Sequence, residues 1–178
     1  MKKHQGFTIW FTGLPCCGKT TIANQVSVIL KKRGFLVEQL DGDLIRQSFS
    51  SDLSFSKKDR DENISRATFL AKMLSRNNVV VLASFVSPYR KQRRRARKQI
   101  KNFVEVYVRC PVKICMKRDV KGMYKKALEG KIQHFTGVDD PYEEPEHPEL
   151  IVDTDIESVE ESVGKVLQKI EEIGYLKE

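Results

Sequence analysis

The chain has few of the residues that build metal centres or disulfide frameworks. Its 178 residues include four cysteines and three histidines. Cys16 and Cys17 are adjacent, which rarely permits the torsion of a disulfide, and neither this pair nor Cys110 and Cys115 has C-x-x-C spacing. A zinc or redox site is therefore the weaker interpretation, and we expect reduced thiols in a cytoplasmic protein.

Long apolar runs are also lacking. The first apolar stretch, residues 7–12, is too short for a membrane span or a secretory signal and leads directly into a loop. No internal repeat or low-complexity linker divides the sequence. We therefore expect one domain, residues 1–178, in the cytoplasm and without membrane association.

Positive charge is concentrated in one stretch. The formal net charge is +8, and residues 90–101, RKQRRRARKQIK, carry eight basic and no acidic side chains, which accounts for the whole excess. A basic stretch of this kind usually forms a helix face that is exposed to solvent without binding a partner. The more specific alternative is a helix that binds a polyanion. Because no aromatic platform or nucleic-acid motif accompanies it, no nucleic-acid partner is expected.

A glycine-rich pattern follows the first apolar stretch. Residues 13–20 read GLPCCGKT, which matches G-x-x-x-x-G-K-T between a predicted strand (7–12) and an amphipathic helix that stops at Gly34. In such a loop the backbone N–H groups surround phosphates at the positive end of the helix. Lys19 would reach the β and γ phosphates, and Thr20 would ligate Mg²⁺. The predicted ATP-binding residues are Gly13, Leu14, Pro15, Cys16, Cys17, Gly18, Lys19, Thr20 and Thr21.

The remaining pattern predicts alternating strands and helices. Further strands are expected at 35–40, 78–85, 103–110 and 149–154. A helix is expected at about 56–76, and the basic helix should begin with Ser87 as N-cap and Pro88 in its first position. A short helix should follow the strand at 103–110 and end at about 118, and another should lie around 121–129. The last helix is expected after a cap formed by Thr154 and Glu157. This order predicts a P-loop nucleoside triphosphate hydrolase-type α/β sandwich of three layers, with a parallel five-stranded sheet and helices on both faces.

Residues 119–145 interrupt this alternation. The segment is long, contains Gly, Pro and charge, and has one short helical pattern. Connections of this length inside a compact domain are usually functional. The apolar side chains of Met123, Tyr124 and Phe135 make a disordered insertion the weaker interpretation. We predict a lid over the phosphate loop.

Two carboxylates follow the second predicted strand. Asp41 and Asp43 lie at the carboxyl end of this strand, where open α/β sheets bind ligands. One of them could hold the water shell of the metal ion or accept a proton from an attacking hydroxyl, and the alternative is a simple Asp-Gly turn. No guanine-binding N-K-x-D motif is present, which favours a kinase with a small acceptor over a GTPase.

Several separate motifs occur in one order: GFTIWFTGLP, LDGDLIR, FSKKDRDENISR, SFVSPYRKQRRRAR and FTGVDDPYE. Over about residues 6–154 the sequence resembles the adenylyl-sulfate kinase family. The resemblance implies transfer of the ATP γ-phosphate to the 3′-hydroxyl of adenosine 5′-phosphosulfate (APS), with ATP and Mg²⁺ as cofactors, in sulfate assimilation. It also implies a separate ATP sulfurylase that supplies APS, and it leaves a homodimer open.

The resemblance implies an acceptor site as well. Its predicted catalytic residues are Lys19, Asp41, Asp43 and Ser87, with Asp43 preferred over Asp41 because the Arg46 segment follows it. The guanidinium groups of Arg46 and Arg60 can each donate two hydrogen bonds to sulfate or phosphate oxygens. The rings of Phe55 and Phe135 could stack on the adenine. The predicted acceptor-binding residues are Asp43, Arg46, Phe55, Arg60, Asn63, Val86, Ser87, Lys125 and Phe135.

Ser87 matches a serine that the family assigns as phosphorylated. With no histidine or other evident base beside it in the sequence, we prefer an acceptor-site and helix-terminus role. Leu44, Ser54 and His134 depart from the family pattern, and Cys16 and Cys17 stand where Gly and a small residue are common. Two alternatives remain: a kinase of the same fold with another nucleotide or small hydroxyl acceptor, and a nucleic-acid-binding protein that uses residues 90–101.

Overall fold

A single parallel sheet forms the centre of the molecule. The structure is a computed structural model that describes residues 5–176. Its strands pair in the order β2-β3-β1-β4-β5, and every pair is parallel, as predicted. The strands are β1 (Thr8–Thr12), β2 (Val37–Asp41), β3 (Val80–Ser84), β4 (Phe103–Arg109) and β5 (Leu150–Asp153).

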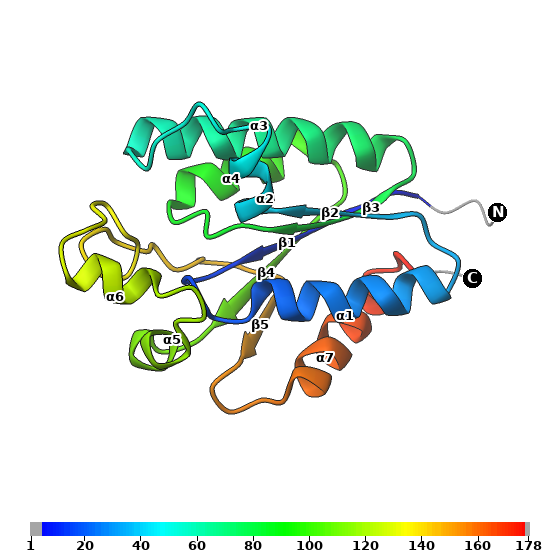
Figure 1. The fold of residues 1–178 in the computed structure, drawn as a ribbon. Coiled ribbons are helices and arrows are strands. Elements are labelled where there is room, and N and C mark those ends of the chain that lie inside the picture. Colours follow the sequence, from blue (N-terminus) through cyan, green and yellow to red (C-terminus); the bar gives the residue numbers. More distant parts are fainter. Residues whose placement is uncertain (1–4, 177–178) are drawn as a thin grey trace.

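Helices cover both faces of this sheet (Figure 1). On one face α1 and α7 pack on one apolar cluster, and on the other face α3 and α4 pack on a second cluster. The predicted three-layer sandwich is therefore confirmed. The helices are α1 (Lys19–Lys32), α2 (Gly42–Gln47), α3 (Lys57–Arg76), α4 (Arg90–Gln99), α5 (Val112–Arg118), α6 (Met123–Leu128) and α7 (Val159–Glu172).

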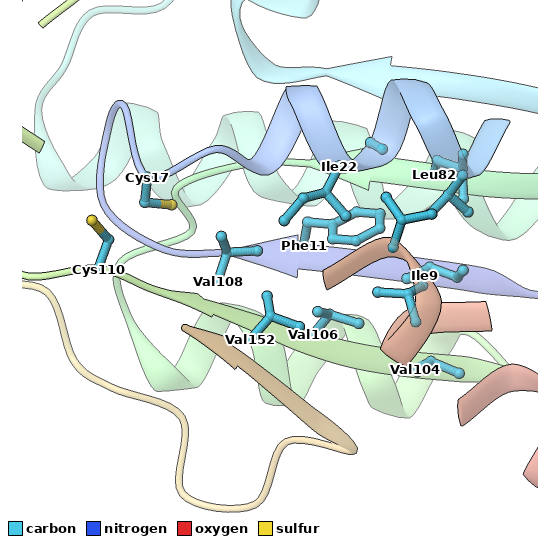
Figure 2. Close-up of a cluster of buried hydrophobic side chains, with 14 of the residues drawn as sticks. Ile9, Phe11, Cys17, Ile22, Leu82, Val104, Val106, Val108, Cys110 and Val152 are labelled. Atoms are coloured by element: carbon cyan, nitrogen blue, oxygen red, sulfur yellow. The ribbon is translucent and has the colours of Figure 1, made fainter. Parts of the chain in front are cut away.

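The two apolar clusters explain why the central strands carry apolar side chains on both faces. In β1, Ile9 and Phe11 belong to the cluster under α1 and α7, whereas Trp10 belongs to the cluster under α3 and α4. Alternate side chains thus enter opposite cores, so consecutive apolar residues replace the alternation of apolar and polar residues seen in strands with one exposed face. Figure 2 shows the first cluster, with Ile9 and Phe11 of β1 near Ile22 of α1.

The strand order places the phosphate loop at the turning point of the sheet. From β1 the chain runs to the edge strand β2, returns to β3 beside β1, and then builds β4 and β5 on the other side. Ligands of open parallel sheets bind in the crevice that such a reversal leaves at the carboxyl ends of the strands. The loop after β1, residues 13–18, opens into this crevice.

The structure shows one helix start that the sequence analysis did not predict and corrects two that it did. The Asp-Gly sequence after β2 is a helix start rather than a simple turn, since Asp41 caps α2 by accepting from the N–H groups of Asp43 and Leu44. The last helix begins after Ser158, which exchanges side chain–backbone hydrogen bonds with Glu161. Thr154 does not cap it.

The basic helix likewise begins later than predicted. The N-cap of α4 is Tyr89, not Ser87. Ser87 adopts a left-handed φ of 39° and uses its hydroxyl elsewhere, so it cannot satisfy the first N–H groups of the helix. The Glu143 carboxylate accepts from the Arg90 N–H instead, at 2.8 Å. None of the helices between residues 5 and 176 is both long and apolar enough to cross a membrane.

Candidate active site

The loop between β1 and α1 requires glycine at two positions. Gly13 has a φ of 153°, and a Cβ atom there would lie 2.3 Å from the Val108 carbonyl oxygen of β4. Gly18 has a φ of 101°, a conformation that side chains rarely permit. The backbone therefore curls tightly before α1, whose 14 residues direct a positive helix end into the crevice.

Lys19 is the first residue of α1 and is folded over the loop. Its Nζ donates to the carbonyl oxygens of Gly13 at 2.9 Å and Leu14 at 2.7 Å. The side chain is largely buried, and Cys17 Sγ is a third, weaker acceptor at 3.6 Å. A phosphate held by the loop would offer charged acceptors in place of the carbonyls.

The two adjacent cysteines occupy different environments. Cys17 is fully buried in the cluster under α1 and α7, and Figure 2 shows it beside Cys110 at the end of β4. Burial raises the pKa of the Cys17 thiol, although the nearby Lys19 ammonium opposes this shift. Cys16 faces the crevice with a φ of 61°. A protonated core thiol is a poor nucleophile or metal ligand, which favours the phosphate-loop interpretation over a redox or zinc site.

A large cavity extends from the phosphate loop to α3. Its volume is about 910 Å³, at the upper end of the range for ligand pockets. It does not include Lys125, which is exposed on α6, while Gly13, Leu14 and Cys17 lie behind the loop surface. The predicted residues that line it are Pro15, Cys16, Gly18, Lys19, Thr20, Thr21, Asp41, Asp43, Arg46, Phe55, Arg60, Asn63, Val86, Ser87 and Phe135.

One corner of the cavity is rich in oxygen atoms. The Thr20 hydroxyl donates to Asp41 Oδ2 at 2.7 Å, and Asp41 is the parallel-register partner of Ser84 on β3. The Ser84 hydroxyl is buried, lines the cavity and has no hydrogen-bond partner within residues 5–176. Carboxylate and hydroxyl oxygens of this kind fit a Mg²⁺ ion that keeps part of its water shell.

Asp43 faces a cation from the lid. Its carboxylate forms an ion pair with Lys121, in the turn between α5 and α6. This hydrogen bond raises the pKa of Lys121, against the smaller opposing effect of burial. Lys121 lines the cavity, so the structure brings Lys121 rather than the predicted Lys125 to this site.

The far end of the cavity holds two arginines around an aromatic ring. The guanidinium carbons of Arg46 and Arg60 lie 4.4 Å and 5.6 Å from the ring centre of Phe55. Burial lowers the pKa of both arginines, and in Arg46 the neighbouring Arg60 charge adds to the effect. Arg60 and Asn63 share one face of α3, as predicted, and Asn63 Oδ1 is buried without a partner in the described chain. Two desolvated cations favour an anionic ligand here.

Arg60 also holds the lid. It donates to the Thr136 hydroxyl at 2.9 Å and to the His134 carbonyl, and Asp140 lies 3.8 Å away. His134 has a φ of 59°, so it keeps the left-handed backbone that a glycine would adopt easily. The lid therefore lies docked against α3 in this structure.

The lid packs on the phosphate loop as well. Phe135 is buried and meets Tyr124 edge to face with ring centres 5.0 Å apart. The Tyr124 hydroxyl donates to the Pro15 carbonyl at 3.1 Å. The lid thus spans both ends of the cavity (Figure 1, where α6 lies beside the loop before α1).

Ser87 is a largely buried residue of the cavity wall. Its hydroxyl accepts from the Trp10 indole N–H at 3.1 Å and donates to the Thr12 hydroxyl at 3.0 Å. Thr12 in turn donates to the Val86 carbonyl at 2.8 Å. These partners are an indole, a hydroxyl and a carbonyl, so no base is in contact with Ser87 within residues 5–176. This geometry favours a positioning role over a nucleophilic one.

Comparison with known proteins identifies the family. The family model described as "Adenylylsulphate kinase" matches residues 5–153. The chain belongs to the adenylylsulphate kinase family. It is 52% identical over 176 residues to the adenylyl-sulfate kinase of Halothermothrix orenii, covering 99% of this chain and 95% of that protein.

Solved structures agree with this assignment. An APS kinase of Mycobacterium tuberculosis in complex with AMPPNP and APS has a TM-score of 0.91 and 38% identity, over 95% of this chain and 99% of that one. A hexameric APS kinase from Thiobacillus denitrificans has a TM-score of 0.76 and 35% identity, over 98% of this chain and 30% of that one.

This adenylylsulphate kinase chain has further cavity residues that the sequence did not reveal. Arg118, at the end of α5, donates to the Thr154 hydroxyl at 3.2 Å, and Thr154 donates to the Cys17 carbonyl at 2.8 Å. Both line the cavity next to Gly18. The position of Thr154 just after β5, at the carboxyl edge of the sheet, was an available signal that we did not use.

Proposed function

We propose that this kinase transfers the γ-phosphate of ATP to the 3′-hydroxyl of APS, giving 3′-phosphoadenylyl sulfate and ADP. The observation that carries the proposal is one cavity with a phosphate loop at one end and two desolvated arginines around an aromatic ring at the other. An acceptor with a purine ring and two anionic groups matches the second end. The family membership supports the same acceptor.

The phosphate loop would bind ATP. Backbone N–H groups of residues 13–20 and the end of α1 would hold the phosphates, and Lys19 would turn from its carbonyl partners to the β and γ phosphates. Thr20 and Asp41 would hold Mg²⁺ and its water shell, with the Ser84 hydroxyl nearby. When bound, this ion neutralises charge on the phosphates.

The second end would bind the acceptor. Arg46 and Arg60 would donate to its sulfate and phosphate oxygens, and Phe55 with Phe135 would stack on its adenine. Asn63 and the Val86–Ser87 backbone would orient the ribose. Asp43 would accept the 3′-hydroxyl proton, and Lys121 would neutralise developing negative charge.

Direct in-line transfer needs only positioning and charge stabilisation, so no phosphoserine at Ser87 is required. Lid residues 119–145 would exclude water, which otherwise competes with the 3′-hydroxyl for the γ-phosphate. The whole chain would then act as one kinase domain.

A coupled assay of ADP release tests the proposal. Wild-type protein with ATP, Mg²⁺ and APS should turn over. Gluconate, shikimate and adenosine 5′-phosphate should give little turnover, because each lacks the purine or the second anion. Lys19→Ala serves as the inactive control. Faster turnover with another acceptor would instead support a different kinase of this fold.

We also propose that the reaction takes place in the cytoplasm as a step of sulfate assimilation. A separate ATP sulfurylase would supply the APS. A homodimer is the oligomer we propose, and the hexameric APS kinase of Thiobacillus denitrificans supports self-association in the family. Sedimentation of the purified protein tests it, and a strictly monomeric protein would contradict it.

A further inference from the structure

The basic helix α4 contains a buried arginine. Arg93 has a side chain only 2% exposed, although it belongs to the stretch expected to face solvent. Around it, Arg90, Arg94 and Arg97 pair with the acidic segment, which we define as residues 142–149. Part of the charge of this helix is therefore paired with acidic groups of its own chain.

Each of the three guanidinium nitrogens of Arg93 donates a hydrogen bond. Its Nε donates to Glu105 on β4 at 2.8 Å, and Nη1 donates to the Ser87 carbonyl at 2.6 Å. Nη2 donates to the Glu143 carbonyl of the acidic segment, and the guanidinium lies over the Tyr142 ring at 5.6 Å. One rigid group thus joins the β3–α4 loop, the end of the lid and the sheet.

Stability alone does not explain this arrangement. Buried ion pairs contribute little net free energy, because the cost of removing both charges from water offsets their attraction. Arg93 and Glu105 continue into Arg97 and Glu149, which gives a chain of alternating charge with no net excess, buried at Arg93 and Glu105 and partly exposed at Arg97 and Glu149. The specific feature is that the remaining donors of Arg93 end on two backbone carbonyls next to the cavity.

The Ser87 carbonyl belongs to a strained backbone. A φ of 39° is strained in a serine and persists only where the surroundings impose it. Trp10 and Thr12 hold the side chain, and the Tyr142 hydroxyl is 2.9 Å from the same Thr12 hydroxyl. Arg93 holds the Ser87 carbonyl, so it orients the Ser87–Pro88 peptide, which follows Val86 in the cavity wall.

We propose that Arg93 is a positioning residue for the acceptor: it fixes the Val86–Ser87 backbone and ties it to the end of the lid. This inference rests on the proposed function, because Val86 and Ser87 are the wall that APS would meet. Arg93 has no contact with the phosphate loop among its hydrogen-bond partners. It should therefore set acceptor affinity and leave ATP affinity nearly unchanged.

Arg93→Lys is the decisive variant, because lysine keeps the charge but cannot reach Glu105, Ser87 and Glu143 together. We expect the KM for APS to rise about tenfold or more, the loss for one or two charged hydrogen bonds, while the KM for ATP stays within about twofold. Arg97→Lys is the matched control, since Arg97 bonds the same Glu105 but has no bond to Ser87. It should reduce thermal stability with neither KM changed.

The single tryptophan gives a second measurement. Trp10 is bonded to Ser87 and stacks on Phe85 with ring centres 5.2 Å apart, so its fluorescence should respond to APS binding without ATP. Arg93→Lys should shift the midpoint of this titration to higher APS concentration. Equal changes in both KM values, or an unchanged titration, would overturn the proposal.

Glu105→Gln keeps the test valid if Arg93→Lys does not fold. Glutamine retains the shape but removes the charge that orients Arg93, so the KM for APS should rise by a smaller factor, about threefold, with the KM for ATP constant. No change in this ratio would also overturn the proposal. Wild-type turnover with APS reports separately on the proposed function.

Discussion

The ammonium of Lys19 is held by carbonyls of its own loop, which are partners that it can exchange for phosphate oxygens. Lys19→Ala should therefore reduce turnover on the order of a thousandfold, as for other lost groups that stabilise transition-state charge. A steady-state ADP-release assay measures this loss, and circular dichroism checks the fold. Lys32→Ala, at the other end of α1, should behave as wild type. Near-normal turnover of Lys19→Ala would contradict the nucleotide assignment.

Asp41 and Asp43 lie two residues apart but have different partners. Asp41 contacts Thr20 at the oxygen-rich corner, whereas Asp43 pairs with Lys121. Asp43→Asn should lose most of its turnover, about a hundredfold or more, because the amide cannot accept the proton. Asp41→Asn should instead need more Mg²⁺ for the same rate, since asparagine still caps α2 and only the charge is lost.

A Mg²⁺ titration of both variants separates these roles. If Asp41→Asn is inactive at every Mg²⁺ concentration while Asp43→Asn stays active, the roles are reversed. Both variants should unfold at the wild-type temperature within a few degrees.

At the scale of elements, the lid is the segment whose role is most open to test. Phe135→Ala should weaken APS binding by about 1–3 kcal/mol, the range for loss of one base-stacking ring. ATP affinity should change much less, since Phe135 packs on Tyr124 and lies by the acceptor end of the cavity. Hydrogen exchange in residues 119–145 should slow when ADP and APS are added together.

Leu128→Ala is a suitable control for the lid, because Leu128 belongs to the same segment but is exposed and does not line the cavity. It should leave both affinities unchanged. A Phe135→Ala defect confined to ATP would mean that residues 119–145 are not an acceptor lid.

Strands and the phosphate loop were predictable because their signals are local. Residues 80–84 read as a strand from their own apolar and β-branched side chains, and Gly13 and Gly18 mark a loop that only glycine can form. The start of α4 was not predictable in this way. The Ser87 hydroxyl bonds to Thr12, 75 residues away in the sequence, and therefore does not cap the helix. The carboxylate of Glu143, 53 residues from Arg90, accepts the hydrogen bond from the first N–H group of α4 instead.

Among the cavity residues, too, those with local sequence signals were predicted and those placed by long-range contacts were not. Lys19, Thr20 and the two aspartates were found because each belongs to a short motif beside a strand. Lys121 was not singled out, because its contact with Asp43 joins segments 78 residues apart, whereas Lys125 stays a prediction for the acceptor site. The burial of Arg93 was equally hidden, because its partners come from three separate segments.

At the scale of the whole molecule, paired carboxylates set the response to acid. The pKa of Glu149 is lowered: burial would raise it, but hydrogen bonds from Arg97 and from the Glu105 N–H prevail. The Arg109 guanidinium lowers the pKa of Asp153 in the same way. The unfolded chain then binds protons that the native protein does not, so stability is present above pH 5 and declines as the pH falls toward 3.

Thermal unfolding between pH 7 and pH 3 measures this decline. Glu149→Gln should lower Tm at pH 7 by about 2–4 °C, the shift for about 1 kcal/mol in a chain of this size, and should flatten the acid decline. Glu160→Gln, on the exposed side of α7, should follow the wild-type curve. A Glu149→Gln curve parallel to wild type would contradict this assignment.

The pairing of α4 with the acidic segment also has an evolutionary consequence. Arg97 and Glu149 are 52 residues apart, yet each is the other's bidentate partner, and both adjoin Glu105. A mutation that removed Glu149 alone would leave a half-buried guanidinium with one partner fewer, whereas loss of both groups together would be tolerated. Positions 97 and 149 should therefore be inherited as a pair among relatives, although no motif search would group them.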